Sequence, residues 1–123
     1  MEELSDTGNI QNIVEFWRKY GYMDISKDQL DFIISRHLEY KTLEVIKVDK
    51  KIAGVCRYNI CGDTCECLDI VIKPEHRKKN ILKLMLIQGL RKFPLTTKLT
   101  YVRGFKDNNN REVSIMKFLG VRI

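Results

Sequence analysis

The stretch from Thr64 to Gly89, TCECLDIVIKPEHRKKNILKLMLIQG, constrains the fold of this chain more than any other. Its first part is rich in apolar and β-branched residues and ends before Pro74, which predicts a central strand buried on both faces. Its last part is apolar almost all round, which predicts a helix packed deeply against a sheet. A strand that enters a helix through a basic loop directs backbone N–H groups and positive charge at one point. The stretch therefore predicts a site for a phosphate-bearing ligand.

The basic residues of this loop are His76, Arg77, Lys78 and Lys79. The whole chain has a net charge of +6, which either an anionic partner or a lysine-rich solvated surface would explain. The local cluster is more informative than the total, because it follows a strand and precedes a helix. No aromatic-rich basic strand or helix-turn-helix pattern accompanies it, so the sequence does not favour a nucleic-acid binder.

The composition is that of one domain over residues 1–123, with 44% hydrophobic residues, enough for a core. No apolar run approaches the roughly 18 residues of a membrane span, and the N-terminus MEELSDTGNIQ is unlike a secretory signal. We therefore expect a cytoplasmic protein, of a host cell or of a virus-infected cell. The four cysteines contain no C-x-x-C pair, which favours thiols in strands over a metal site, and a reducing compartment disfavours a disulfide.

Hydrophobic periodicity and turn residues predict the element order ααβββαβα, an α+β fold with a mixed sheet. The short turns favour antiparallel pairing of the first three strands, and the helical crossover favours a parallel pairing of the third and fourth. The expected elements are helices at Asn9 to Tyr20 and from the N-cap Ser26 to Glu39, strands at Leu43 to Val48, Ile52 to Ile60 and Thr64 to Lys73, a helix from Ile81 to before Phe93, a strand at Leu99 to Phe105, and a helix that starts at Asn108 to Asn110 and ends before Gly120.

Two polar residues add to the loop as candidate site residues. Strand alternation would place Glu66 on one face with Leu68, Ile70 and Ile72, and a carboxylate on an apolar face is a candidate general base. A strand-end Glu that faces water is the alternative interpretation. Asn109 would lie at the start of the final helix, as a ligand-binding residue or as a simple turn residue.

From Leu43 to Gly120 the sequence resembles the GNAT superfamily, the Gcn5-related N-acetyltransferases. VIKVDKKIAGVCRYNI resembles the second and third strands of that family, and LDIVIKPEHRKKNILKLML resembles its acetyl-CoA segment of strand, pyrophosphate loop and helix. YVRGFKDNNNREVSIMKFLGV resembles its fifth strand and the following helix. The resemblance covers about two-thirds of the chain.

The resemblance implies acetyl-CoA as the cofactor and assigns roles to individual residues. Arg77 matches the first position of the (Gln/Arg)-x-x-Gly-x-(Gly/Ala) loop, and Asn80 and Leu82 stand where its two small residues are expected. Glu66 falls where some members have the Glu that deprotonates the acceptor amine. The residues expected to bind the cofactor are Ile70, Val71, Ile72, Arg77, Lys78, Lys79, Asn80, Ile81, Leu82 and Asn109. No metal is implied.

The departures from the family pattern leave two functions open. Asn80 can adopt the positive φ of a Gly, whereas Leu82 could crowd the pyrophosphate, and Met116 replaces a Tyr that protonates the departing thiolate in many members. The first function is direct acetyl transfer from acetyl-CoA to a primary amine of a small molecule or a peptide. The second is an inactive structural or interaction protein on the same fold, of cellular or viral origin. Members of the family usually have one or two further strands on the acceptor side, so the resemblance also implies that a homo-oligomer or a partner protein could complete the sheet.

Overall fold

The computed structural model describes residues 10–21, 25–77, 80–102 and 110–115. The elements are α1 (Ile10–Tyr20), α2 (Lys27–Glu39), β1 (Leu43–Val48), β2 (Lys51–Cys61), β3 (Thr64–Ile72), the 3-10 turn η2 (Pro74–His76), α3 (Ile81–Lys92), β4 (Lys98–Val102) and β5 (Asn110–Ser114). In this part of the chain no helix is long and apolar enough to cross a membrane.

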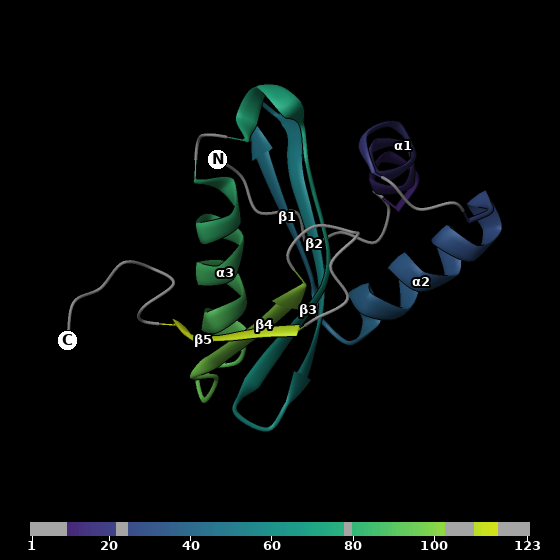
Figure 1. Cartoon of the computed structure of the whole chain (residues 1–123). Helices are drawn as coiled ribbons and strands as arrows, with labels where there is room; N and C mark the ends of the chain where they lie inside the picture. Colours follow the sequence, from purple (N-terminus) through teal and green to yellow (C-terminus); the bar gives the residue numbers. More distant parts are fainter. Residues whose placement is uncertain (1–9, 22–24, 78–79, 103–109, 116–123) are drawn as a thin grey trace.

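The five strands form one sheet in the order β1-β2-β3-β4-β5. Neighbouring strands are antiparallel except β3 and β4, which are parallel because α3 connects them as a crossover. Figure 1 shows α3 against one face of the sheet and α1 with α2 against the other. This α+β architecture with a mixed sheet confirms the predicted fold class and the predicted strand directions.

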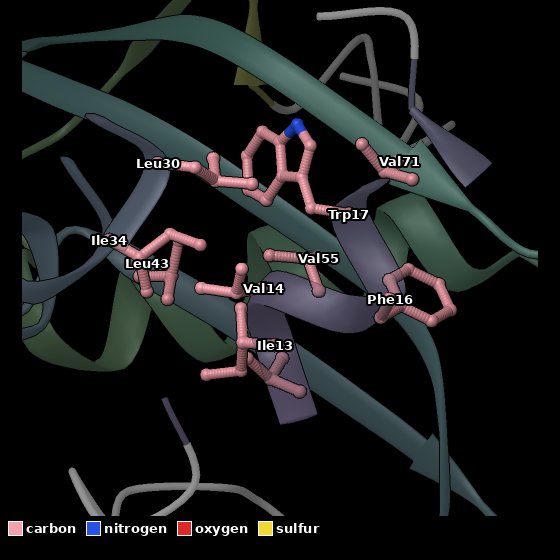
Figure 2. Packing of buried hydrophobic residues seen from close by; sticks show 10 residues of the cluster. Ile13, Val14, Phe16, Trp17, Leu30, Ile34, Leu43, Val55 and Val71 are labelled. Atoms are coloured by element: carbon pink, nitrogen blue, oxygen red, sulfur yellow. The ribbon is translucent and has the colours of Figure 1, made fainter. Parts of the chain in front are cut away.

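The layer of α1 and α2 forms because each helix has one apolar stripe. The N-cap predicted at Ser26 is confirmed and forms a capping box: the Gln29 N–H donates to Ser26 Oγ at 3.2 Å, and the Ser26 N–H donates to Gln29 Oε1 at 3.1 Å. Trp17 of α1 is 1% exposed and packs in one cluster with Leu30 and Val71, as Figure 2 shows. Trp17 therefore belongs to the core between the sheet and these two helices.

A second core lies between the sheet and α3. Ile81 and Met85 of α3 pack in one cluster with Ile46 and Ala53 of the first two strands. At the start of α3 the fit is close, since a Cβ atom at Gly54 would lie 2.7 Å from Ile81 Cγ2. A glycine in β2 therefore lets α3 begin directly above the strands.

The end of the chain differs from the prediction. Asn110–Ser114 is strand β5, paired antiparallel with β4, so the helix predicted from the Asn run is wrong for these residues. The alternation of exposed and core residues explains the difference: Val113 packs into the core on the α3 side, whereas Ser114 is exposed. Residues 116–119, where that helix was expected to continue, lie outside the described residues.

A β-bulge interrupts β3 at Leu68. Arg57 of β2 is opposite Asp69, whereas the next residue of β2, Tyr58, is opposite Cys67, so Leu68 is the extra residue. A bulge bends its strand and is common beside active sites.

The bulge also changes which side chains of β3 share a face. Cys67 before it and Ile72 after it both pack on the α3 side. Because side chains alternate along a strand, Glu66 lies on the opposite side, facing the layer of α1 and α2. The prediction that Glu66 shares a face with Ile70 and Ile72 is therefore wrong, since a strict period of two does not continue through a bulge.

Candidate functional site

The parallel strands β3 and β4 pair only over a short length. Thr64, Cys65 and Glu66 are opposite Lys98, Leu99 and Thr100. From Cys67 to Ile72, β3 has no strand partner on that edge among the described residues. In Figure 1, β4 and β5 run at a steep angle to β3. The two strands therefore diverge from Glu66 toward the loop before α3, and a cavity lined by residues of both strands forms a cleft there.

The free edge of β3 presents alternate backbone groups to this cleft. The Lys73 N–H donates to the Ala53 carbonyl at 2.9 Å, so Lys73 faces β2. By alternation along the antiparallel pair, Val71 also directs its backbone groups to β2, while Ile70 and Ile72 direct theirs to the free edge. Of the three β3 residues predicted to bind the cofactor, Ile70 and Ile72 therefore direct their backbone N–H groups to the free edge, and Val71 does not.

The loop between β3 and α3 is shaped for close approach of a ligand. After the 3-10 turn, Arg77 Nε donates to the Ile72 carbonyl at 3.4 Å, which keeps this exposed guanidinium at the end of β3. Asn80 then has φ 58° and ψ 26°, a left-handed conformation, at the N-cap of α3. The predicted use of Asn in place of Gly at this position is confirmed. No N–H of the first turn of a helix has an intrahelical partner, so this turn can bind an anion.

A cavity of about 790 Å³ occupies the cleft and continues beneath α3. Its walls come from β2, β3 and β4 and from α3, with Trp17 of α1 and Glu44 of β1 at its borders. Leu82 lines this cavity and packs against the core on the α3 side. Its side chain therefore forms part of the apolar wall of the cleft.

Three of the four cysteines, Cys56, Cys65 and Cys67, line the cavity. Cys56 Sγ and Cys67 Sγ are 3.8 Å apart, and both thiols are free, as the sequence predicted for thiols in strands. Burial raises the pKa of Cys65 to about 12, and the hydrogen bond with Cys67 together with burial raises the pKa of Cys56. The thiols of Cys56 and Cys65 are therefore uncharged at neutral pH and act as small apolar wall residues.

The closed end of the cavity holds a buried polar group. Glu44, which is 3% exposed, accepts a hydrogen bond from Tyr58 Oη and forms an ion pair with Lys92. Burial and the Glu44 carboxylate both raise the pKa of Tyr58, so the phenol keeps its proton. Nothing in the sequence singled out this group, because a Glu in an apolar strand gives no sign of a partner 48 residues away at the end of α3.

The face opposite α3 carries two carboxylates near the cleft. Glu66 is half-buried at the apex, opposite Asn59 and Thr100, and is not part of the cavity wall. Asp69, one residue past the bulge, does line the cavity and forms an ion pair with Arg57. The sequence reasoning missed Asp69, since only the bulge places it on this face.

Of the residues predicted to form the site, Ile70, Val71 and Leu82 line the cavity. Ile72 ends β3, and Arg77, Asn80 and Ile81 lie between that end and the first turn of α3, outside the cavity wall. Lys78, Lys79 and Asn109 lie outside the described residues, as does Met116.

Strand β3 has a bulge and a free edge, and left-handed Asn80 precedes α3. This arrangement defines a fold that can bind an extended ligand with a pyrophosphate group. The model of the acetyltransferase (GNAT) family matches residues 9–120. The chain belongs to this family, as its resemblance predicted. No curated protein matches the chain.

Solved structures share the fold at low sequence identity. A putative GNAT acetyltransferase from Desulfovibrio desulfuricans has a TM-score of 0.60 at 13% identity, over 80% of this chain and 69% of that one. The PaiA N-acetyltransferase from Thermoplasma acidophilum, in complex with coenzyme A, has a TM-score of 0.56 at 14% identity, over 87% and 81%. A predicted acetyltransferase from Clostridium acetobutylicum, with acetyl-CoA, has a TM-score of 0.61 at 13% identity, over 99% and 88%.

Proposed function

We propose that this protein transfers the acyl group of acetyl-CoA to a primary amine of a small molecule or peptide. One observation carries the proposal: β3 leaves β4 at Glu66 and then runs with a free edge to a loop that ends in left-handed Asn80. An extended amide-bearing arm can add to such an edge as a further strand would. Its pyrophosphate would then lie at the N-terminus of α3.

The residues that would hold the donor follow from this geometry. The backbone N–H groups of Ile70 and Ile72 and the Ile70 carbonyl face the free edge and would pair with the amides of the pantetheine arm, and the Val71 side chain lines the cavity. Arg77 and the backbone at Asn80 and Ile81 would face the pyrophosphate. We also propose Lys78, Lys79 and Asn109 as donor-binding residues, on the resemblance alone, and Leu82 as part of the wall below the arm.

The chemistry would be direct transfer. The nitrogen of the acceptor amine attacks the thioester carbonyl carbon, a C–N bond forms, the C–S bond breaks, and the thiolate departs. A carboxylate on the face of α1 and α2 would take the amine proton. Glu66 is the candidate from the sequence, and Asp69 is the candidate that lines the cleft.

The test is calorimetric titration of the purified protein with acetyl-CoA, followed by release of free coenzyme A in the presence of spermidine, a lysine-containing peptide or a peptide with a free N-terminus. We expect saturable binding, weakened by Arg77→Ala, and release of thiol only when an amine is present. Absence of binding at millimolar acetyl-CoA would overturn the proposal. A stable complex or homo-oligomer formed without acetyl-CoA would then favour a structural or interaction protein.

A cytoplasmic setting also fits this function. The described thiols are free, and reduced thiols persist in reducing compartments where acyl-CoA donors are made. This inference comes from the chemistry of the thiols, and cell fractionation would test it.

A further inference from the structure

We propose that the cleft accepts acyl-CoA donors whose acyl chain is longer than acetyl, with a saturated chain of medium length as the preferred group. This inference rests on the proposed function, because it concerns the tail of the same donor. It arises from the shape and chemistry of the cavity beyond the point that an acetyl group would reach.

The cavity does not end where the strands meet. Cys65 and Leu99 are opposite each other at the apex of the cleft, and both line the cavity. The space continues past them, because Leu90 and Phe93 from the second half of α3 line it too. A ligand that enters along the free edge of β3 therefore meets further open space under α3.

The length of this space exceeds what the arm and an acetyl group would fill. From Ile72 to Leu68, the free edge that the pantetheine arm would follow is about 13 Å long, at about 3.3 Å per residue. Beyond Leu68 the cavity continues along the same strand to Cys65, about 10 Å further at about 3.3 Å per residue. An acetyl group extends one methyl beyond the thioester carbonyl, so the portion near Cys65 would stay unfilled.

Small side chains create this portion of the cavity. Cys56, Cys65 and Gly89 stand where larger residues would fill the space between α3 and the strands. A Cβ atom at Gly89 would lie 3.2 Å from Tyr58 Oη, so the helix already lies close to the sheet at the closed end. The unfilled part of the cavity therefore lies beside Cys56 and Cys65, and it does not result from a wide gap between α3 and the sheet.

The walls of this portion suit a hydrocarbon chain. Burial raises the pKa of Cys65, so this thiol carries no charge at neutral pH, and the other residues that line this portion are apolar or aromatic except Thr96 and Glu44. At the closed end, the Glu44 carboxylate is already engaged by Tyr58 and Lys92. A methylene chain would replace water in this portion without separating a charged group from its partner.

The test compares acetyl-, butyryl-, hexanoyl- and octanoyl-CoA by calorimetric titration of the full chain. Burial of each methylene predicts about fourfold tighter binding per added carbon until the cavity is full, and thus about 15-fold between acetyl-CoA and butyryl-CoA. Equal affinity along the series, or affinity that falls with chain length, overturns the inference while leaving the proposed function in place. Failure of all four to bind overturns both.

Two variants locate the effect. Cys65→Leu fills the portion beyond the apex, so it should abolish the preference for hexanoyl-CoA over acetyl-CoA. Cys61→Leu is the matched control, because Cys61 is exposed and does not line the cavity. If Cys65→Leu does not fold, Cys65→Ala serves instead: it enlarges the space and should retain or increase the preference. Loss of the preference in Cys65→Ala, or its retention in folded Cys65→Leu, contradicts the inference.

Discussion

Arg57 binds Asp69 through one oxygen of the carboxylate. Both Nε, at 2.7 Å, and Nη2 of Arg57 donate to Asp69 Oδ2. On its other side, Arg57 Nη1 lies 3.5 Å from His37 Nε2, and His37 Nδ1 lies 2.7 Å from Thr42 Oγ1. This chain of contacts fixes the orientation of the carboxylate, whose second oxygen makes none of these bonds.

We predict that Asp69→Asn lowers kcat/KM for acyl transfer by at least about 100-fold, because removal of a general base typically costs a rate factor of this size. Glu66→Gln should have a smaller effect, because Glu66 is not part of the cavity wall. The measurement is steady-state kinetics with any amine that turns over, beside calorimetry with acetyl-CoA. Both variants should bind the donor as the parent does. A larger loss in Glu66→Gln would return the role of base to Glu66.

The same chain of contacts predicts a pH dependence of stability. Burial, and then the nearby Arg57 guanidinium, lower the pKa of His37 below its usual value of about 6.5. The folded state therefore favours the neutral ring, and the unfolded chain binds the proton first. The contribution of neutral His37 to the free energy of unfolding is therefore complete above about pH 6.5. It is lost as the pH falls toward the lower pKa that His37 has in the folded state.

Urea unfolding of the parent and of His37→Gln, in steps from pH 7.5 to pH 5, tests this directly. Subtracting the variant from the parent removes the titration of all other groups. We expect the unfolding free energy of the parent to decrease relative to that of His37→Gln as the pH falls. A difference that is independent of pH would contradict the lowered pKa.

Because Asn80 has a left-handed conformation, substitutions at this position that strain the backbone should lower both the stability of the protein and its affinity for acetyl-CoA. Asn80→Val should lower the unfolding free energy by about 1–2 kcal/mol, since a β-branched residue is strained at positive φ, and should weaken acetyl-CoA binding. Asn80→Gly should keep both stability, within about 1 kcal/mol, and binding.

Lys41 supplies the control for this pair, because it is also left-handed, with φ 61°, and is exposed away from the loop. Lys41→Val should cost similar stability and leave the affinity for acetyl-CoA unchanged. If it weakens binding as much as Asn80→Val does, the loop has no special role in binding.

The contact between Gly54 and Ile81 predicts a coupled pair of substitutions. Gly54→Ala places a Cβ atom 2.7 Å from Ile81 Cγ2 and should cost about 1–3 kcal/mol of unfolding free energy through overpacking. Combining it with Ile81→Ala, which removes that methyl, should cost less than the sum of the two single changes. Strict additivity, measured by urea unfolding, would show that the start of α3 is not held by this contact.

The sequence was sufficient for the elements whose signals are local. The N-cap at Ser26, a strand that ends before Pro74 and the positive φ of Asn80 all depend on residues within a few positions of one another, and each formed as predicted. The predicted burial of this strand on both faces is wrong, because most of β3 is half-buried and Ile70 is 39% exposed.

Features that depend on distant pairing could not be predicted in this way. The bulge at Leu68 depends on how β3 aligns with β2, and it reverses the face of Glu66 relative to Ile72. Strand β5 depends on the edge of β4, which outweighed the helical signal of the Asn run. The partner of Glu44 depends on where α3 ends. Strand register is decided by long-range packing, so these parts of the site required the structure.

The most direct test of the site is the backbone amide NMR spectrum of the protein as coenzyme A is added. If the donor arm pairs with the free edge of β3, the amide signals of Ile70 and Ile72 shift with saturable dependence on coenzyme A. The amide of Val71, which donates toward β2, should shift much less. Shifts confined to the surface of α1 and α2, or no shifts at millimolar coenzyme A, would contradict the account.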